Sequence, residues 1–421
     1  MSGVRQPFYH RNCDVDELSY QVFGTRTLMT ELGTVRLEPG DFSRIPVAVA
    51  HDNHADTDIH VLFYVPAPVE ERYPAARVSE PLVPPFPGWQ EGTRNLMTTE
   101  CLGGPEDVPV RVAAAGLAPS TMKLLRHGAF RHLPTTPGHE AAGTVVAAGA
   151  GAGRDLVGRR VRVHPMLSCR ACRYCTTDRE QMCAESAMIG QAAFGTGSLE
   201  LYERYHDGGL AEYVRVPHWL VDVLPDGVGF DLGAKVHDLG NAVRALRCAG
   251  PLTDAALVVT AATGTMGTAS ILLAEHFGVA RLVLVGRSAQ RLEAVRELAG
   301  PLPADVIALE ELGPDWGAGG GLTERIRELV PEGPEAVLDY LPAGPGADQS
   351  MMALANGGTL VHMGGDGASL TVPLRVTMLG CWRYVGTRAC TRGDTAMALD
   401  LLGSGALRPS AWSPTASPWP R

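Results

Sequence analysis

The sequence has no apolar run long enough to span a bilayer, which argues against a membrane-spanning helix. It also has no excess of basic residues. The formal net charge is -10, which argues against nucleic acid or an anionic membrane as a partner, because both reward basic patches. The first residues, Met-Ser-Gly-Val-Arg-Gln, contain no apolar stretch that would direct export. We therefore expect a cytoplasmic protein of two or three domains that acts on a small molecule.

Four of the nine cysteines fall within one short, mostly polar stretch: Cys169, Cys172, Cys175 and Cys183. This spacing is typical of a structural zinc site with four sulfur ligands, which has no open coordination position and contributes folding energy rather than chemistry. The cysteines could instead pair as disulfides, but a chain without an export signal is expected in a reducing compartment. We predict one zinc ion, whose loss destabilises the loop without directly affecting the reaction site.

A nucleotide site is indicated where a buried-strand pattern at 256–260 precedes a glycine-containing turn and helical sequence from Thr268 to His276. The residues of the predicted turn are Thr263, Gly264, Thr265, Met266 and Gly267. Strand, turn and helix place unpaired N–H groups and the positive end of the helix against a pyrophosphate. A second strand at 281–285 and further strand–helix alternation to residue 363 predict a doubly wound parallel sheet of the α/β class.

The second strand ends at Gly286, Arg287 and Ser288, where no acidic residue is present to bind a ribose 2′-hydroxyl. Arg287 and Ser288 offer a cation and a hydroxyl to a 2′-phosphate. The sequence therefore favours NADP(H) over NAD(H). The alternative is that Arg287 is a solvated side chain at the start of the next helix.

Two further motifs flank the cysteines: Pro137-Gly138-His139-Glu140-Ala141-Ala142-Gly143 and Gly208-Gly209-Leu210-Ala211-Glu212-Tyr213. Together with the cysteine spacing they resemble the zinc-containing medium-chain alcohol dehydrogenase/reductase family from about residue 95 to about 408. The resemblance implies a homodimer or homotetramer. It also implies three segments: a GroES-like β-rich catalytic domain at 95–235, a Rossmann nucleotide-binding domain at 236–368 and a return to the catalytic domain at 369–421.

The same resemblance implies catalytic roles for Ser120, His139 and Glu140. The zinc enzymes have a cysteine ligand at the position of Ala118, and alanine cannot bind a metal, whereas Ser120 keeps the hydroxyl that relays the proton. His139 keeps the histidine ligand, and Glu140 is its carboxylate neighbour. The run Ala-Pro-Ser-Thr-Met-Lys also resembles the zinc-independent quinone and enoyl reductases.

The third zinc ligand of the family would align with His237 or Asp238. A second zinc on His139 and His237 would lack a full set of three protein ligands. The alternative is that His139 is a hydrogen-bonded histidine without metal. The resemblance thus implies an NAD(P)H-dependent oxidoreductase that transfers hydride to or from a small carbonyl, alcohol or conjugated enone, and the missing cysteine favours the enone. A paralogue that only binds nucleotide is a further alternative.

A separate β-rich module is indicated at 7–69, with antiparallel strands predicted at Arg26–Glu31, Gly33–Leu37, Ile45–Val49 and Ile59–Val65. The run Phe8-Tyr9-His10-Arg11-Asn12-Cys13, with Gly40-Asp41-Phe42, Pro46 and His51, resembles a cupin, and more narrowly homogentisate dioxygenase. The resemblance implies a partial cupin-like β module at residues 1–69.

In cupins two histidines and a glutamate at this spacing bind a metal. His10, Glu17 and His51 match, while Asn12 stands where a further histidine would be. Two imidazoles and one carboxylate suit non-haem iron, so the module could be a metal-dependent dioxygenase. The alternative is a structural module with ordinary surface histidines, which the incomplete barrel favours.

Five prolines at 70–94 predict a semi-rigid linker. After Leu407 the strand and helix patterns stop, whereas the family continues with further elements, so the resemblance implies an early end of the catalytic domain.

Overall fold

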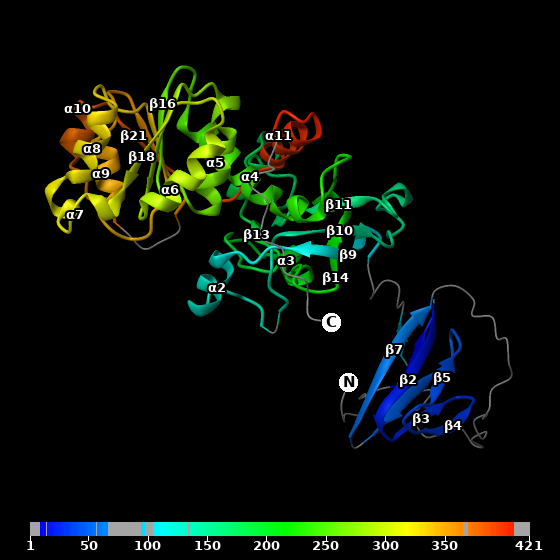
Figure 1. Ribbon diagram of the computed structural model, residues 1–421. Helices are drawn as coiled ribbons and strands as arrows, with labels where there is room; N and C mark the ends of the chain where they lie inside the picture. The colour runs from blue at the N-terminus through cyan, green and yellow to red at the C-terminus, as the bar shows by residue number, and fades with distance from the viewer. Residues whose placement is uncertain are drawn as a thin grey trace. The chain divides into compact units, whose positions relative to one another are not determined.

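The computed structural model describes residues 9–65 apart from 14 and 56, the backbone of Arg94–Leu96, residues 104–364 apart from 134, and residues 369–407. The predicted linker, except Arg94, and the segment after Leu407 lie outside the described residues. The chain forms two compact units (Figure 1). One comprises Met1–Asp107 with Gly149–Gly153, and the other Val108–Ala148 with Arg154–Arg421. None of the described helices is long and apolar enough to cross a membrane.

The first unit contains a five-stranded sheet of order β4-β3-β6-β1-β8 and a three-stranded sheet of order β5-β2-β7. Its strands are β1 (His10–Asn12), β2 (Asp16–Gly24), β3 (Arg26–Thr30), β4 (Gly33–Leu37), β5 (Phe42–Ile45), β6 (His51–His54), β7 (Asp58–Val65) and β8 (Arg94–Leu96). The predicted strand Ile45–Val49 is wrong, because β5 ends at Ile45. Pro46 has no N–H for a ladder, and Ala48 has a φ of 68°.

The three-stranded sheet has polar residues on its buried face and apolar residues on its exposed face. Besides Asp16 at its start, the buried side chains of β2 are Glu17, Ser19 and Gln21. The exposed side chains include Tyr20, Val22, Phe42, Ile59 and Phe63. Because successive strand residues point to opposite faces, this pattern follows directly from the alternation in β2. The unit therefore encloses charge and presents an apolar surface to water.

In the second unit, a five-stranded sheet of order β14-β9-β10-β11-β15 forms the β-rich domain. Its strands are β9 (Asp107–Ala115), β10 (Ala141–Val145), β11 (Arg160–Val163), β14 (Tyr213–Pro217) and β15 (Val221–Val223); the nearby hairpin strands are β12 (Met166–Leu167) and β13 (Ala187–Met188), and the helices are α2 (Pro119–Arg126) and α3 (Glu200–Arg204). Strand β10 begins directly after Glu140, so the sheet fixes the position of the His139–Glu140 pair.

A six-stranded parallel sheet of order β18-β17-β16-β19-β20-β21 forms the rest of the second unit and confirms the doubly wound prediction. Its strands are β16 (Ala256–Val259), β17 (Arg281–Gly286), β18 (Ala304–Ala308), β19 (Ala336–Asp339), β20 (Thr359–His362) and β21 (Arg383–Gly386). The chain order reverses between β16 and β19, and such a reversal opens a ligand crevice at the carboxyl ends of the strands.

Strand β16 is buried on both faces, as a parallel strand requires. Leu257 and Val259 face one core with helices α4 and α5, whereas Val258 faces the other with α8. Helices α5 and α6 lie on one side of this sheet, and α8 and α9 on the other (Figure 1). The helices are α4 (Phe230–Ala249), α5 (Thr265–Ala274), α6 (Ala289–Arg296), α7 (Trp316–Gly319), α8 (Gly321–Leu329), α9 (Gly346–Met352), α10 (Leu374–Leu379) and α11 (Arg392–Gly403).

Helix α4 contacts both domains of the second unit, because it packs on β10 and β11 and also on α5 and β20. The predicted boundary between residues 235 and 236 lies inside this continuous helix. Its first turns carry Lys235, His237 and Asp238, so these three side chains are fixed by both domains.

Candidate active site

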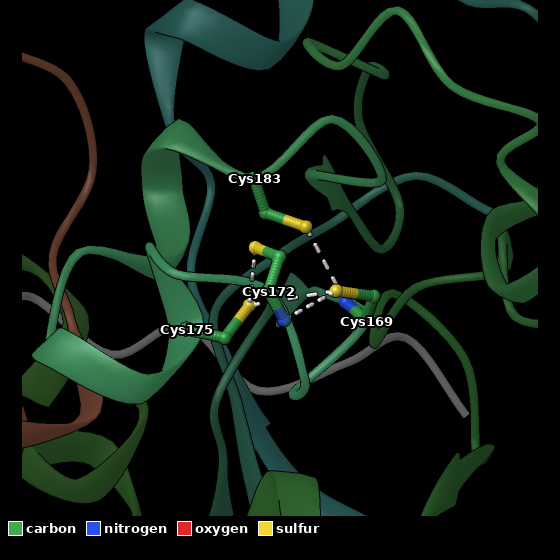
Figure 2. A group of neighbouring side chains, drawn as sticks. All are labelled: Cys169, Cys172, Cys175 and Cys183. Atoms are coloured by element: carbon green, nitrogen blue, oxygen red, sulfur yellow. Dashed lines mark hydrogen bonds between the residues drawn. The ribbon is translucent and has the colours of Figure 1, made fainter.

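The four cysteines of the predicted zinc loop lie together (Figure 2), with their sulfur atoms all within 4.8 Å of one another. The Sγ atoms of Cys169 and Cys175 are 3.9 Å apart, and those of Cys172 and Cys175 are 3.6 Å apart. Tetrahedral zinc with Zn–S bonds of about 2.3 Å needs S–S separations of roughly 3.8 Å. The backbone N–H of Cys172 donates to the Cys169 sulfur. None of the four is in a disulfide. The set therefore fits a zinc ion.

The loop that carries the four cysteines also forms part of the wall of a large cavity, which is described below. The Arg388 guanidinium donates to the Gln181 carbonyl at 2.9 Å, which fastens the loop to the segment before α11. Tyr174, Gln181 and Met182 of the loop line the cavity described below. The loop that carries the cysteines therefore contributes part of the cavity wall.

The predicted nucleotide turn lies at the N-terminus of α5, which begins at Thr265, three residues earlier than predicted. Ala261 has a φ of 46°, and Gly264 is the N-cap residue. A Cβ on Gly267 would lie 2.6 Å from the Cα of Ala262, so only glycine lets the helix approach the strand this closely. The first-turn N–H groups of α5 are thus available to a phosphate.

At the end of β17 the structure places an acidic group that sequence reasoning missed. Gly286 ends the strand, Arg287 is exposed and Ser288 is the N-cap residue of α6. The Ala289 N–H donates to Oε1 of Glu310 at 2.9 Å. Glu310 follows β18, and only the pairing of β17 with β18 brings its carboxylate to this helix end.

A cavity of about 1090 Å³ lies between the β-rich domain and the carboxyl end of the parallel sheet. The residues predicted for the catalytic and nucleotide sites that line it are Ser120, His139, Glu140, His237, Gly264, Thr265, Met266 and Gly267. Thr263 and the run Gly286–Ser288 are not in its lining. The structure therefore brings the predicted catalytic residues and the nucleotide turn into one site.

His139 is held in one tautomer by its neighbours. Its Nδ1 atom lies 3.2 Å from Nε2 of Gln191 and 3.1 Å from Oγ1 of Thr121. Because an amide N–H can only donate, Nδ1 accepts and the proton of the neutral ring lies on Nε2, which is 3.8 Å from Oε1 of Glu140. Burial lowers the pKa of His139 to about 4. The same amide lies 3.4 Å from the Ser120 hydroxyl and so connects the predicted relay to the histidine.

The donor set beside His139 does not fit a second zinc ion. The rings of His139 and His237 meet edge to face with centroids 5.1 Å apart, so the structure does bring the two predicted ligands together. Ala118, the N-cap residue of α2, has no ligand atom. In the described part of the chain no third side chain completes a metal-binding group with this pair.

A buried ion cluster lies next to the histidines. Lys235 Nζ is 2.7 Å from Oε2 of Glu140 and also forms an ion pair with Asp238. Burial by itself would lower the pKa of Lys235, but the two carboxylates outweigh it and raise that pKa. Burial, followed by the charge of Glu140, raises the pKa of Asp238 to about 6. Gly116 leaves room for the cluster, because a Cβ there would lie 1.7 Å from Oε2 of Glu140.

Another polar group in the lining follows the ends of three adjacent strands. His362 ends β20, and its Nδ1 lies 2.7 Å from Oδ2 of Asp339, which ends β19. The Thr260 hydroxyl, directly after β16, donates to the other oxygen of Asp339 at 2.9 Å. The sequence shows a polar residue at the end of each buried-strand run. Whether these polar residues lie close together depends on the order of the strands in the sheet.

The predicted metal ligands of the first unit also come together. His10, Glu17 and His51 are buried, with one ligand atom of each within 4.8 Å of the others. The alternative of ordinary surface histidines is therefore wrong. His51 Nδ1 lies 3.0 Å from the Val49 carbonyl and its Nε2 lies 3.3 Å from Glu17. Asn12 occupies no ligand position and donates to Glu17 Oε2 at 3.0 Å.

Comparison with known families agrees with the fold. The alcohol dehydrogenase GroES-like domain matches residues 104–226, and the zinc-binding dehydrogenase family matches residues 265–404. The chain belongs to the zinc-binding medium-chain dehydrogenase/reductase family. It is an oxidoreductase of that type, which transfers hydride between a nicotinamide cofactor and a small carbonyl or alcohol substrate.

Similar proteins include the probable D-xylulose reductase A of Aspergillus clavatus, which is 28% identical over 72% of this chain and 81% of its own length. The sorbitol dehydrogenase of Gallus gallus is 27% identical over 68% of this chain and 77% of its own. Among solved structures, the alcohol dehydrogenase TADH of Thermus sp. ATN1 is 25% identical with a TM-score of 0.62, covering 72% of this chain and 84% of its own.

Proposed function

We propose that the chain reduces a small carbonyl compound or conjugated enone with NADPH and needs no catalytic metal ion. The observation that carries this proposal is the cavity in which Ser120 and His139 accompany the nucleotide turn while Ala118 supplies no ligand. Fixed charges and hydrogen-bond donors then polarise the substrate oxygen. This favours an enone, because its extended π system needs less polarisation at oxygen for hydride to add at the β-carbon.

The test is NADPH consumption by chelator-treated protein with three substrates: D-xylulose, a small aldehyde and a cyclic enone. We expect turnover of the aldehyde or the enone that survives mild chelation. Two tightly bound zinc ions per chain, with activity abolished by chelation and restored by zinc, would contradict the proposal. Turnover of D-xylulose alone would place the chain with the polyol enzymes that it resembles.

We propose NADP(H) as the preferred cofactor, with Arg287 and Ser288 facing the 2′-phosphate. A structural relative of 26% identity and TM-score 0.61, a zinc-binding dehydrogenase from Sinorhizobium meliloti 1021, is bound to NADP. Glu310 opposes this preference, because its carboxylate lies at the same helix end as the phosphate would. The preference is therefore a balance between the two side chains.

We propose that Cys169, Cys172, Cys175 and Cys183 hold one structural zinc ion. The proposal is supported by the sulfur separations and by the backbone N–H groups that donate to the sulfurs. A set of four thiolates needs a reducing compartment, so we also propose a cytoplasmic location.

We propose a homodimer or homotetramer. Strand β21 is an edge of the parallel sheet, and the segment around it exposes apolar side chains: Leu374, Met378, Leu379 and Tyr384. Such a patch is typical of an interface. Sedimentation of the parent and of Leu379→Glu tests this, and a parent that sediments as a monomer would contradict it.

We propose a second function for the first unit, a cupin-like dioxygenase centre in which His10, Glu17 and His51 bind a divalent metal such as Fe²⁺. The supporting observation is the buried set of two imidazoles and one carboxylate. His51→Ala should lose bound iron, whereas His54→Ala, an exposed position on the same strand, should keep it. Equal iron contents in both variants would contradict the site.

A further inference from the structure

Lys235 is an uncommon residue in this chain. Lysine occurs at only two positions, Lys123 and Lys235, and every other member of the 36 basic residues is arginine. Both line the cavity, but Lys123 is exposed on α2, whereas the side chain of Lys235 is 15% exposed. An ammonium is a compact charge with three donors, unlike the planar guanidinium. The ion pairs with Glu140 and Asp238 account for two of these donors.

The surroundings of this ammonium group are those of a cation site. His139, His237, Glu140 and Asp238 are buried and line the same cavity. One ammonium group and two carboxylates carry a net formal charge of −1. A Zn²⁺ ion with two anionic ligands and one further carboxylate carries the same net charge. The net charge of this part of the cavity is therefore that of a site with a bound zinc ion, although Ala118 provides no metal ligand.

We propose that Lys235 is a catalytic residue whose ammonium group takes the place of a metal ion and donates a hydrogen bond to the substrate oxygen. This inference rests on the proposed function. When bound, the reduced nicotinamide supplies the hydride, which forms a C–H bond at the carbonyl carbon or the β-carbon. The ammonium stabilises the electron pair that moves onto the oxygen. For a simple carbonyl, Ser120 then gives a proton to that oxygen and regains one from solvent. For an enone, the enolate takes its proton at the α-carbon from solvent. Glu140 and Asp238 are positioning residues.

A chromophoric aldehyde tests the polarisation directly. The absorption of 4-(dimethylamino)cinnamaldehyde moves to longer wavelength when its oxygen is polarised by a cation or a strong donor. With chelator-treated protein, we expect this shift in the parent and in the control Arg325→Met, which removes an exposed cation outside the cavity lining. We expect a reduced shift in Lys235→Arg and none in Lys235→Met. An unshifted spectrum in the parent, or an equal shift in Lys235→Met, overturns the proposal.

Kinetics separate a catalytic role from a structural one. Lys235→Met should lower kcat by about 100-fold or more while leaving NADPH affinity unchanged. Because this variant leaves two buried carboxylates unpaired, Lys235→Met/Glu140→Gln is the second test, and it should show the same loss. Parent-like kcat in the double variant overturns the proposal. Failure of the proposed function is a separate outcome, seen as a parent chain that does not bind NADPH in a titration.

Discussion

At the scale of single residues, Gly116 allows the carboxylate of Glu140 to reach Lys235. In Gly116→Ala the new methyl group would lie 1.7 Å from Oε2 of Glu140, so the carboxylate must move away. We expect a loss of about 1–3 kcal/mol in the free energy of unfolding, measured with denaturant. Gly319→Ala is the matched control, because a Cβ there meets nothing within 4 Å. An equal loss in the control would contradict this reason.

A buried histidine makes stability depend on pH. Burial, and then the charge of Arg162, lower the pKa of His164 well below 6.5. The folded ring stays neutral where the unfolded ring takes up a proton, so the unfolded state binds more protons below that value. Stability is therefore complete above about pH 6.5 and falls as the pH falls below it.

His164→Asn tests this dependence, because its amide oxygen can still accept from Arg162 but cannot titrate. The variant should lose less stability than the parent between pH 7 and pH 5 in denaturant unfolding. Parallel losses in the two proteins would show that other groups control the acid sensitivity.

We propose that cofactor choice depends on two opposed side chains, Arg287 and Glu310. Arg287→Asp removes a charge-assisted contact and adds repulsion, each worth roughly 1–3 kcal/mol, so NADPH affinity should fall while NADH affinity stays. Glu310→Gln should act in the opposite direction and strengthen NADPH binding, because it removes a carboxylate from the N-terminus of α6. Fluorescence titration with both cofactors measures this. Equal affinities for both cofactors in the parent would contradict the assignment.

At the scale of elements, the zinc loop is both a support and a wall of the cavity. Cys172→Ser should lower zinc content and stability together, and it should raise KM because Gln181 and Met182 line the cavity. Cys381→Ser, at an exposed cysteine outside the loop, is the control. Zinc content by elemental analysis and the melting temperature are the measurements. Unchanged zinc in Cys172→Ser would contradict the ligand set.

Local sequence patterns predicted most elements of the nucleotide-binding domain. The buried runs gave β16 and β17 because parallel strands are apolar on both faces. The same reasoning failed at Ile45–Val49, where Pro46 interrupts an apolar run. It also placed a boundary inside α4, because a helix shared by two domains has no break in its own sequence.

The candidate site was only partly predictable for a related reason. The cysteine loop and the glycine turn are short, so their spacing alone brings the residues together. Glu310 and His362 act through partners that strand order brings close, and Lys235 reaches Glu140 because α4 packs on β10. A single sequence gives neither arrangement. The three ligands of the first unit were predicted through a resemblance, but their burial was not.

At the scale of the whole molecule, the two compact units should respond to different ligands. NADPH at 100 times its Kd stabilises the unit that binds it by about 2.7 kcal/mol. In calorimetry we therefore expect two unfolding transitions. NADPH should raise the midpoint temperature only of the transition that comes from the unit with the parallel sheet. Arg287→Asp should reduce this shift and leave the other transition in place. A single transition that moves as a whole would contradict independent unfolding.

The apolar outer face of the three-stranded sheet has a consequence for handling the protein. Its exposed aromatic and branched side chains, Tyr20, Val22, Phe42, Ile59 and Phe63, are not needed to bury a core. Attraction between such faces depends on protein concentration and strengthens in salting-out solutions, whereas the folding equilibrium of one chain does not depend on concentration. Concentrated samples should therefore associate and reach a solubility limit while every molecule is still folded. The face of the sheet opposite Glu17 causes this association.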